Sequence, residues 1–274
     1  MPAVYAHKRF GERIFEFLPA DLKQAFTPYK DCFMLGLEGP DIFFYHRPYK
    51  PNETQNRARQ LHLNSAKDFF LSAANKITAQ ETDKPEATAI AAYTAGFICH
   101  FTLDNACHPR VYKLEDTGVS HGRIESEFDK YILRKEGKQV FGNNPAKHFK
   151  ATKETISSAS KILDAKEVEI RRAVRMIKLV NGIFASRFGF VHTFVLFLLK
   201  KLGLEKHYGG MLLHHTDDEA CSAINADLYR DLENAIPQGL ENITIFFKHL
   251  KTTAQTSVID NIFDKDYRGG IIHE

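Results

Sequence analysis

Residues 96–109 read GFICHFTLDNACHP, an apolar segment that places His100, Asp104 and His108 at intervals of four. Successive residues of an α-helix are about 100° apart, so these positions lie within an arc of about 80°. The preceding stretch AIAAYTAGFIC (89–99) is apolar on almost every side, which indicates a helix buried within the fold. An ionised aspartate there is costly unless it is paired or bound to a metal. The three side chains therefore predict a metal site or, as the alternative, a hydrogen-bonded polar stripe between packed helices.

A second segment, SHGRIESEFD (120–129), repeats the arrangement with His121 and Glu125, again four residues apart. A His–Glu pair at this spacing can bind one ion from one face of a helix. Exposed pairs of this kind are common, so the pair alone is a weak signal. His121 follows His108 by 13 residues, and this distance lets the chain turn back and bring the two sets together.

Three earlier segments add further ligand types. Asp41 lies in LEGPDIFFYH (37–46), His62 in RQLHLNSAKDFF (59–70) and His7 in AVYAHKRF (3–10). Each has a structural alternative, respectively a helix cap, a core histidine and a surface residue. With the two helices, the count becomes five histidines and three carboxylates, which exceeds one zinc site and suits a cluster of two or three ions.

Apolar residues recur at helical spacing along nearly the whole chain, and no alternating β-branched stretch stands out as a strand. We expect an all-α protein that forms one domain over residues 1–274. Its metal site would lie within 1–135, and a mostly structural helical part would cover 150–256. The expected helices are 11–25 with a break at Pro19, 53–78, 83–108, 120–133, and segments near 150–185, 188–203, 217–236 and 239–256.

Local signals mark several helix ends. Asp83 with Glu86, and Thr216 with Glu219, resemble N-terminal capping pairs, and Pro109 is expected to end the helix that begins at Asp83. The polar cluster HHTDDE (214–219) is therefore interpreted as a capped, charged helix start rather than a second metal site.

The composition is ordinary for a globular protein, with 43% hydrophobic and 26% charged residues among 274. The formal charge of +3 is too small by itself to indicate binding to nucleic acid or to an anionic membrane. The four cysteines show no CxxC pairing, and residues 1–17 lack the apolar core of a secretory signal. We therefore expect free thiols and a cytoplasmic protein.

The longest apolar run, FGFVHTFVLFLL (188–199), is shorter than the roughly 20 residues that span a bilayer. We expect it to form a buried helix. Lys200 and Lys201 follow it directly, which leaves open a helix that lies at a membrane interface.

The combined pattern resembles a known family. H-x3-D-x3-H followed by H-x3-E, with GPDIFFY and LH upstream and a histidine near the N-terminus, is similar to the bacterial zinc-dependent phospholipase C family. That family is all-helical and shares a three-zinc architecture with the fungal single-strand-specific nucleases. The resemblance is strongest over residues 1–135, and it implies a phosphodiester hydrolase that uses two or three Zn²⁺ ions.

The resemblance also implies a role for each candidate ligand. One zinc would be held by Asp41, His62, His100 and Asp104, and a second by His108, His121 and Glu125. Asp104 would also bridge to a third ion, which His7 helps to bind. Asp41 is in addition the carboxylate that we expect to orient the attacking water or to act as its general base.

Two departures from the secreted members affect this assignment. Those members have a longer spacing between the counterparts of Asp104 and His108. They also use an N-terminal tryptophan, exposed by signal cleavage, on the third zinc, whereas this chain contains no tryptophan. Removal of Met1 would expose Pro2, whose amine, five residues before His7, could occupy the same position.

We expect the substrate to be a phosphodiester, with a phospholipid head group ahead of nucleic acid and with peripheral membrane contact left open. A nuclease or nucleotidase on the same metal core is the alternative enzyme, for which Phe43, Phe44 and Tyr45 could stack on bases, although these are expected in the core. A non-catalytic metal-binding module also remains open. No protein partner can be inferred from the sequence.

Overall fold

The chain folds into helices, and no strand occurs among residues 4–80, 84–250, 252 and 255–269, which the computed structural model describes. The all-α class predicted from the sequence is confirmed. In chain order, the α-helices and 3-10 helices (η) are α1 (Val4–Phe17), α2 (Ala20–Phe26), η1 (Thr27–Tyr29), α3 (Lys30–Gly36), η2 (Gly39–Tyr45), α4 (Glu53–Leu63), α5 (Lys67–Thr78), α6 (Pro85–Glu115), α7 (His121–Lys135), α8 (Lys153–Ile162), α9 (Glu167–Phe184), α10 (Gly189–Lys201), α11 (Glu205–Tyr208), η3 (Gly209–Met211), α12 (Glu219–Lys248) and α13 (Gln255–Phe263).

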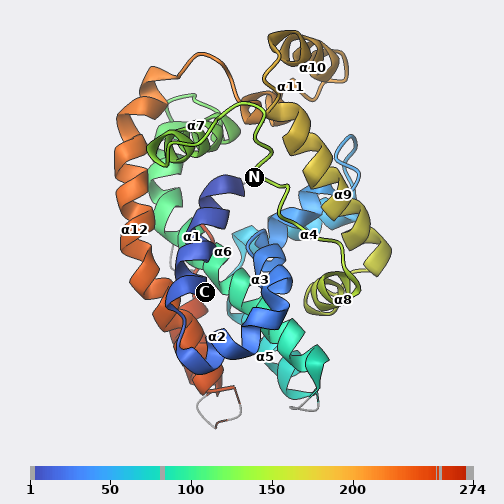
Figure 1. Cartoon of the computed structure of the whole chain (residues 1–274), viewed down its shortest axis with the longest axis vertical. Helices are drawn as coiled ribbons and strands as arrows, with labels where there is room; N and C mark the ends of the chain where they lie inside the picture. The colour runs from blue at the N-terminus through green and yellow to red at the C-terminus, as the bar shows by residue number, and fades with distance from the viewer. Residues whose placement is uncertain (1–3, 81–83, 251, 253–254, 270–274) are drawn as a thin grey trace.

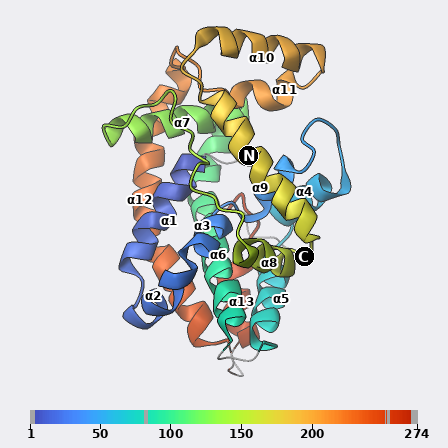
Figure 2. The same cartoon turned by 45° about the vertical axis from the view of Figure 1, so that its right-hand side comes forward.

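Helix α6 is the axis of the fold. It runs through the middle of the molecule, with α12 and α1 on one side and α3 and α8 on the other (Figures 1 and 2). Its residues from Ala89 to Asp104 are all buried, as the apolar sequence on every side of the helix predicts. The segment that carries the candidate ligands is therefore the most enclosed part of the protein.

Helix α6 does not end at Pro109. It continues to Glu115 with the proline inside it, so the predicted boundary is wrong. An internal proline removes one backbone hydrogen bond, which costs about 3 kcal/mol. Tertiary contacts of the following turn offset this cost, because Val111 is buried and Arg110 forms ion pairs with Asp227 and Asp231 of α12.

Other helix boundaries agree in part with the predictions. The break at Pro19 is confirmed, and α7 begins at His121 as expected after Ser120. The predicted helix 53–78 is two helices, α4 and α5. Conversely, α12 is a single helix that passes through Pro237, and its N-cap is Asp218, whose side chain accepts from the Cys221 N–H, rather than Thr216. The Asp83 cap lies outside the described residues.

The prediction of a buried helix over 188–199 is wrong. His192 is the one buried residue of α10, whereas Phe190 is 73% and Phe194 is 60% exposed. The apolar run predicts a hydrophobic helix, but it does not predict whether another element covers that helix. Among the described residues, no helix is long and apolar enough to cross a bilayer.

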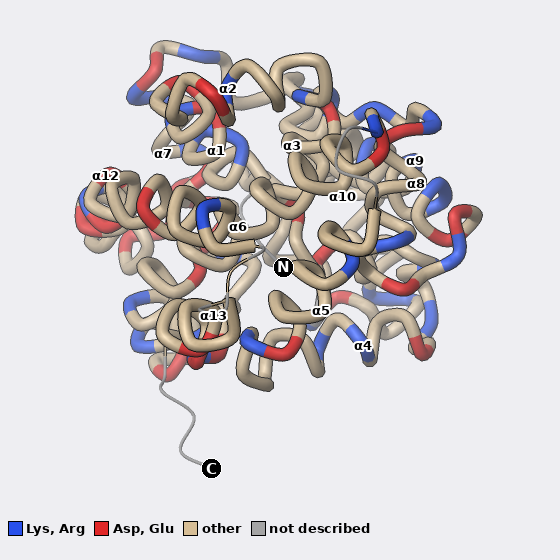
Figure 3. Tube along the Cα trace, turned by 90° about the horizontal axis from the view of Figure 1, so that it is seen from below, with Lys and Arg blue, Asp and Glu red and all other residues tan. Residues whose placement is uncertain are grey.

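One hydrophobic core extends from Val4 near the start of the described chain to Tyr267 near its end. Lys, Arg, Asp and Glu are interspersed around the outer helices (Figure 3). All four cysteines are buried free thiols.

Candidate metal centre

Three potential ligands lie on one face of α6, as their spacing predicts. His100, Asp104 and His108 are 0%, 3% and 6% exposed. Asp104 is central, since its carboxylate lies 3.2 Å from His100 Nε2 and 3.7 Å from His108 Nε2. A buried carboxylate needs such partners, because an unpaired ion in an apolar interior is strongly destabilising.

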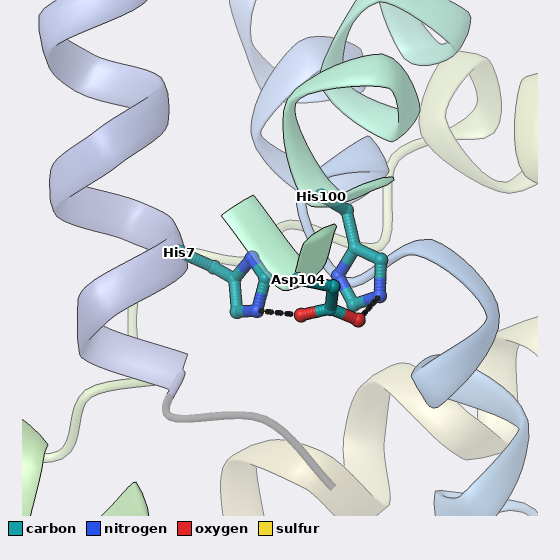
Figure 4. A group of neighbouring side chains, drawn as sticks. All are labelled: His7, His100 and Asp104. Atoms are coloured by element: carbon teal, nitrogen blue, oxygen red, sulfur yellow. Dashed lines mark ion pairs between the residues drawn. The ribbon is translucent and has the colours of Figure 1, made fainter. Parts of the chain in front are cut away.

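His7 of α1 reaches the same carboxylate from the other side. Its Nε2 lies 3.2 Å from Asp104 Oδ1, whereas Oδ2 faces His100, so that Asp104 lies between the two rings (Figure 4). The imidazoles of His7 and His100 stack with centroids 4.4 Å apart. Ligand atoms of these three residues all lie within 4.8 Å of one another, which is close enough for one ion. His7 is 3% exposed and is therefore not the surface residue of the alternative interpretation.

Asp41 and His62 form a second group with His100. Asp41 Oδ1 lies 3.1 Å from His62 Nε2, and its Oδ2 lies 3.6 Å from His100 Nε2. Asp41 is carried by the 3-10 helix η2, which begins at Gly39 with φ +51. A Cβ on Gly39 would lie 2.4 Å from the His100 ring. Glycine is therefore required twice over, for the left-handed backbone and for the close approach that brings Asp41 to His100.

The third group joins α6 to α7. His121 Nε2 lies 3.1 Å from Glu125 Oε1, and His108 Nε2 lies 3.8 Å from the same oxygen. The short connection between α6 and α7 folds the chain back, so the residues separated by 13 positions meet as expected. Ligand atoms of these three residues also lie within 4.8 Å of one another.

The second ring nitrogen of four histidines is bound to an oxygen that can only accept. Three Nδ1 atoms donate to main-chain carbonyls, that of His100 to Leu37 (3.0 Å), that of His62 to Ala58 (2.7 Å) and that of His108 to Tyr267 (2.6 Å). The Nδ1 atom of His121 donates to the Glu115 carboxylate (3.0 Å). In a neutral imidazole the proton then resides on Nδ1, and Nε2 presents its lone pair to the centre. Metal-binding histidines are oriented in this way in proteins.

Several buried atoms of the centre make no well-directed hydrogen bond within the described part of the chain, although they lie close together. These atoms include His100 Nε2, Asp41 Oδ1 and Asp104 Oδ2. Buried polar atoms are nearly always satisfied. Converging imidazole nitrogens and carboxylate oxygens are the donor types that bind Zn²⁺.

The electrostatics of the group favour anionic carboxylates. Burial by itself raises the pKa of Asp104, but His108 and His100 hold that pKa well below its usual value. His62 lowers the pKa of Asp41 against the same effect of burial. Burial lowers the pKa of His7, whereas for His100 the neighbouring Asp104 outweighs burial and raises the pKa to about 9. The lowered pKa values of Asp104 and Asp41 indicate that both carboxylates are anionic, and protons or cations must balance their charge.

The sequence reasoning missed three supporting residues. Asp129 of α7 accepts from the Tyr5 and Ala6 N–H groups at 3.0 and 2.8 Å. It therefore holds the first turn of α1, which directly precedes His7. Its spacing of four from Glu125 was a usable signal. Glu115 and the main chain of Tyr267 had no such signal, because they are brought to the centre only by tertiary structure.

A cavity of about 910 Å³ opens onto the centre. Asp41, Asp104 and Glu125 are among its lining residues, whereas His7 and His100 are not, and therefore lie behind this layer. Arg59 and Arg268 also line the cavity and give it basic side chains. The predicted Pro2 amine lies outside the described residues. His214 and His215 of the HHTDDE cluster belong to none of the three ligand groups, and the cluster precedes α12 as a capped start.

Comparison with known proteins identifies the family. The family model for zinc dependent phospholipase C matches residues 6–180, well over half of the chain and the whole set of eight candidate ligands. No curated protein and no solved structure matches the chain. The matched segment includes the three ligand groups, and the zinc dependence of the family agrees with their chemistry. The chain belongs to the zinc-dependent phospholipase C family.

Proposed function

We propose that this protein hydrolyses phosphodiester bonds with the aid of a zinc cluster, as a phospholipase C-type enzyme. One observation carries the proposal, namely that three neighbouring histidine–carboxylate groups, two of which share His100, converge beneath a cavity large enough for a substrate head group. The continuous core from Val4 to Tyr267 supports treating residues 1–274 as one domain.

The proposed ligand sets follow the three groups. One ion would be held by Asp41, His62, His100 and Asp104, a second by His108, His121 and Glu125, and a third by His7 together with Asp104. The position of Asp104 between His7 and His100 supports a bridging role for it. Two or three Zn²⁺ ions are the expected content.

The reaction requires a polarised phosphate and an oriented water. When bound, zinc supplies Lewis acidity that neutralises phosphate charge and acidifies water. Asp41 lies at the cavity wall with a lowered pKa, so it is an anionic acceptor that can orient the attacking water and take its proton. Arg59 and Arg268 can hold the phosphate by charge-assisted hydrogen bonds.

The alternative functions are weighed by what faces the cavity. Phe43 and Tyr45 are buried, which agrees with a core role, but Phe44 and Tyr112 line the cavity and could stack on a base. A nuclease or nucleotidase therefore remains the second candidate. A purely structural metal site is disfavoured, because such sites are closed, whereas six of the eight candidate ligands line an open cavity.

The test begins with the metal content of protein purified without a chelator, measured by elemental mass spectrometry. Two or three zinc ions per chain are expected. The same preparation is then assayed with p-nitrophenyl phosphorylcholine, a short-chain phosphatidylcholine and a single-stranded DNA oligonucleotide, each with and without EDTA. EDTA-sensitive release from the first two supports the proposal, and cleavage of DNA alone assigns the nuclease function. Turnover of none by zinc-loaded protein contradicts a phosphodiesterase.

A further inference from the structure

Helix α10 presents an apolar surface to solvent. The exposed apolar residues of this helix and of its two caps, together called the α10 surface, range from 39% to 73% exposed and are Phe188, Phe190, Phe194, Phe197, Leu198 and Leu202. Phe190, Phe194 and Phe197 follow helical spacing and so point to the same side. Clustered exposed aromatic residues on this scale mark an interaction site rather than ordinary surface. The surface lies beyond the segment matched by the family model.

One residue of α10, His192, is buried against the body of the protein. His192 packs against His215 and Phe141, with ring centroids 5.1 and 6.5 Å away. Together with the short α11, α10 lies across one end of the molecule (Figure 2). Within the described chain, no other element covers the aromatic side of α10. Phe190, Phe194 and Phe197 therefore do not contribute to the hydrophobic core.

The flanking charges are predominantly basic. Between residues 187 and 206 there are four basic side chains and one acidic side chain, all exposed, namely Arg187, Lys200, Lys201, Lys206 and Glu205. The Arg187 guanidinium lies 4.8 Å from the Phe188 ring centroid, and the Lys201 ammonium lies 5.5 Å from that of Phe197. Aromatic residues edged by Lys and Arg are the combination that binds the interface of anionic bilayers.

The α10 surface leads into the mouth of the cavity. Leu204, Lys206 and Tyr208, which directly follow α10, line the cavity that contains Asp41 and Glu125. The Tyr208 hydroxyl donates to the Pro48 carbonyl at 2.9 Å, which ties this segment to the opposite wall, since Pro48 also lines the cavity. A lipid bilayer that contacts α10 would therefore lie next to the mouth of the cavity.

We propose that the α10 surface docks on an anionic phospholipid bilayer, with Phe190, Phe194 and Phe197 inserted at the head-group level and the basic residues on the lipid phosphates. The bilayer then delivers its head groups to the cavity mouth, and this role rests on the phosphodiesterase function proposed above. A second copy of the chain fits less well, because an isologous contact through α10 opposes basic ends to basic ends.

The test is flotation of the zinc-loaded protein with vesicles of phosphatidylcholine alone and with vesicles that also contain roughly 30% phosphatidylglycerol, because anionic lipid attracts basic segments at the membrane surface. We expect wild-type protein to float with the anionic vesicles. The double variant Phe190→Ser/Phe194→Ser should bind at least about tenfold less, and Lys200→Glu/Lys201→Glu should lose the preference for anionic lipid. The matched control Phe17→Ser, at a residue of α1 that is 53% exposed, should float like wild type.

Parallel measurements separate this inference from the proposed function. Metal content and turnover of soluble p-nitrophenyl phosphorylcholine should be the same in the double variant and wild type, because α10 contributes no group to the centre. Failure of the wild-type protein to float overturns the docking surface. The phosphodiesterase function is then tested by the turnover of soluble p-nitrophenyl phosphorylcholine alone. Flotation without turnover of any substrate supports docking and contradicts the enzyme. A dimer that the double variant abolishes, with no flotation, assigns the surface to self-association and overturns the proposal.

Discussion

Gly36 of α3 and Gly96 of α6 cross with their backbones in direct contact. A Cβ on Gly96 would lie 2.0 Å from the Phe33 carbonyl oxygen and 3.0 Å from Gly36 Cα. The crossing lies one helical turn before His100, whose Nδ1 donates to the Leu37 carbonyl immediately after α3. The close approach of the two helices thus sets the orientation of His100, a candidate ligand.

Replacement of Gly96 by alanine should therefore destabilise the protein. Because the clash is with backbone, which cannot rotate away, we expect a loss of about 2 kcal/mol in the free energy of unfolding. Urea titration of the metal-free protein measures this. Gly189→Ala is the matched control, since a Cβ there meets nothing within 4 Å, and an equal loss in both variants contradicts the explanation.

Asp104→Asn should remove metal and activity together. The substitution keeps the shape of the side chain but deletes the charge that His7, His100 and His108 share. Elemental analysis should show at least one ion fewer per chain, with circular dichroism unchanged. Asp116→Asn, at an exposed position on the C-cap of the same helix, should retain all metal. Full occupancy in Asp104→Asn is incompatible with a bridging role.

Glu115→Gln should weaken metal binding without removing a ligand. Glu115 accepts from His121 Nδ1 at 3.0 Å, and loss of such a partner lowers metal affinity by about 10- to 100-fold. Competition with a chromophoric chelator gives the dissociation constant. Glu86→Gln, near the start of α6 and paired with Lys161, is the control and should bind like wild type. Equal affinities in all three proteins would assign Glu115 to the surface alone.

Zinc binding to the metal-free protein should release protons. The Asp104 carboxylate overcomes burial and raises the pKa of His100 to about 9, so this ring is protonated at neutral pH, and the same carboxylate also raises the pKa of His108. A metal needs the neutral ring, and affinity should therefore rise with pH by about tenfold per unit for the proton displaced from His100, up to about pH 9. Titration calorimetry in buffers of different ionisation enthalpy counts the protons. A heat independent of buffer contradicts this account.

Asp129→Ala should selectively affect the site that contains His7. Asp129 accepts from two N–H groups at the start of α1, and the alanine variant leaves both buried N–H groups without this acceptor, which costs about 2 kcal/mol. We expect lower stability and the loss of one ion, with the other sites retained. Asp260→Ala, at an exposed position of α13, should change neither quantity. Unchanged metal content in Asp129→Ala would contradict a role for the Asp129 hydrogen bonds in placing His7 at the metal centre.

The sequence predicts the centre better than its surroundings. Ligands at intervals of four on one helix, such as His100 and Asp104, are placed by helix geometry alone, and the eight candidates do meet. The all-α class and the buried character of α6 follow from the apolar pattern in the same way. These predictions succeed because they depend on local periodicity.

Features that depend on tertiary contacts escaped prediction. Helix α6 passes Pro109 because residues of α12, distant in sequence, hold the next turn. The run 188–199 forms the expected helix but is exposed, since hydrophobicity does not reveal whether another element is available to cover it. Likewise, the carbonyl of Tyr267 reaches His108 across 159 positions, beyond any local pattern.

That last contact has a consequence for biosynthesis. Tyr267 supplies the acceptor for His108, and its N–H donates to the His62 carbonyl at 3.3 Å. During synthesis, residue 267 is made long after the candidate ligands, the last of which is Glu125. The orientation of His108 is therefore completed only after residue 267 has been made and has packed against α6, so residues 1–135 alone, although they contain all eight candidate ligands, should not reach the full metal affinity.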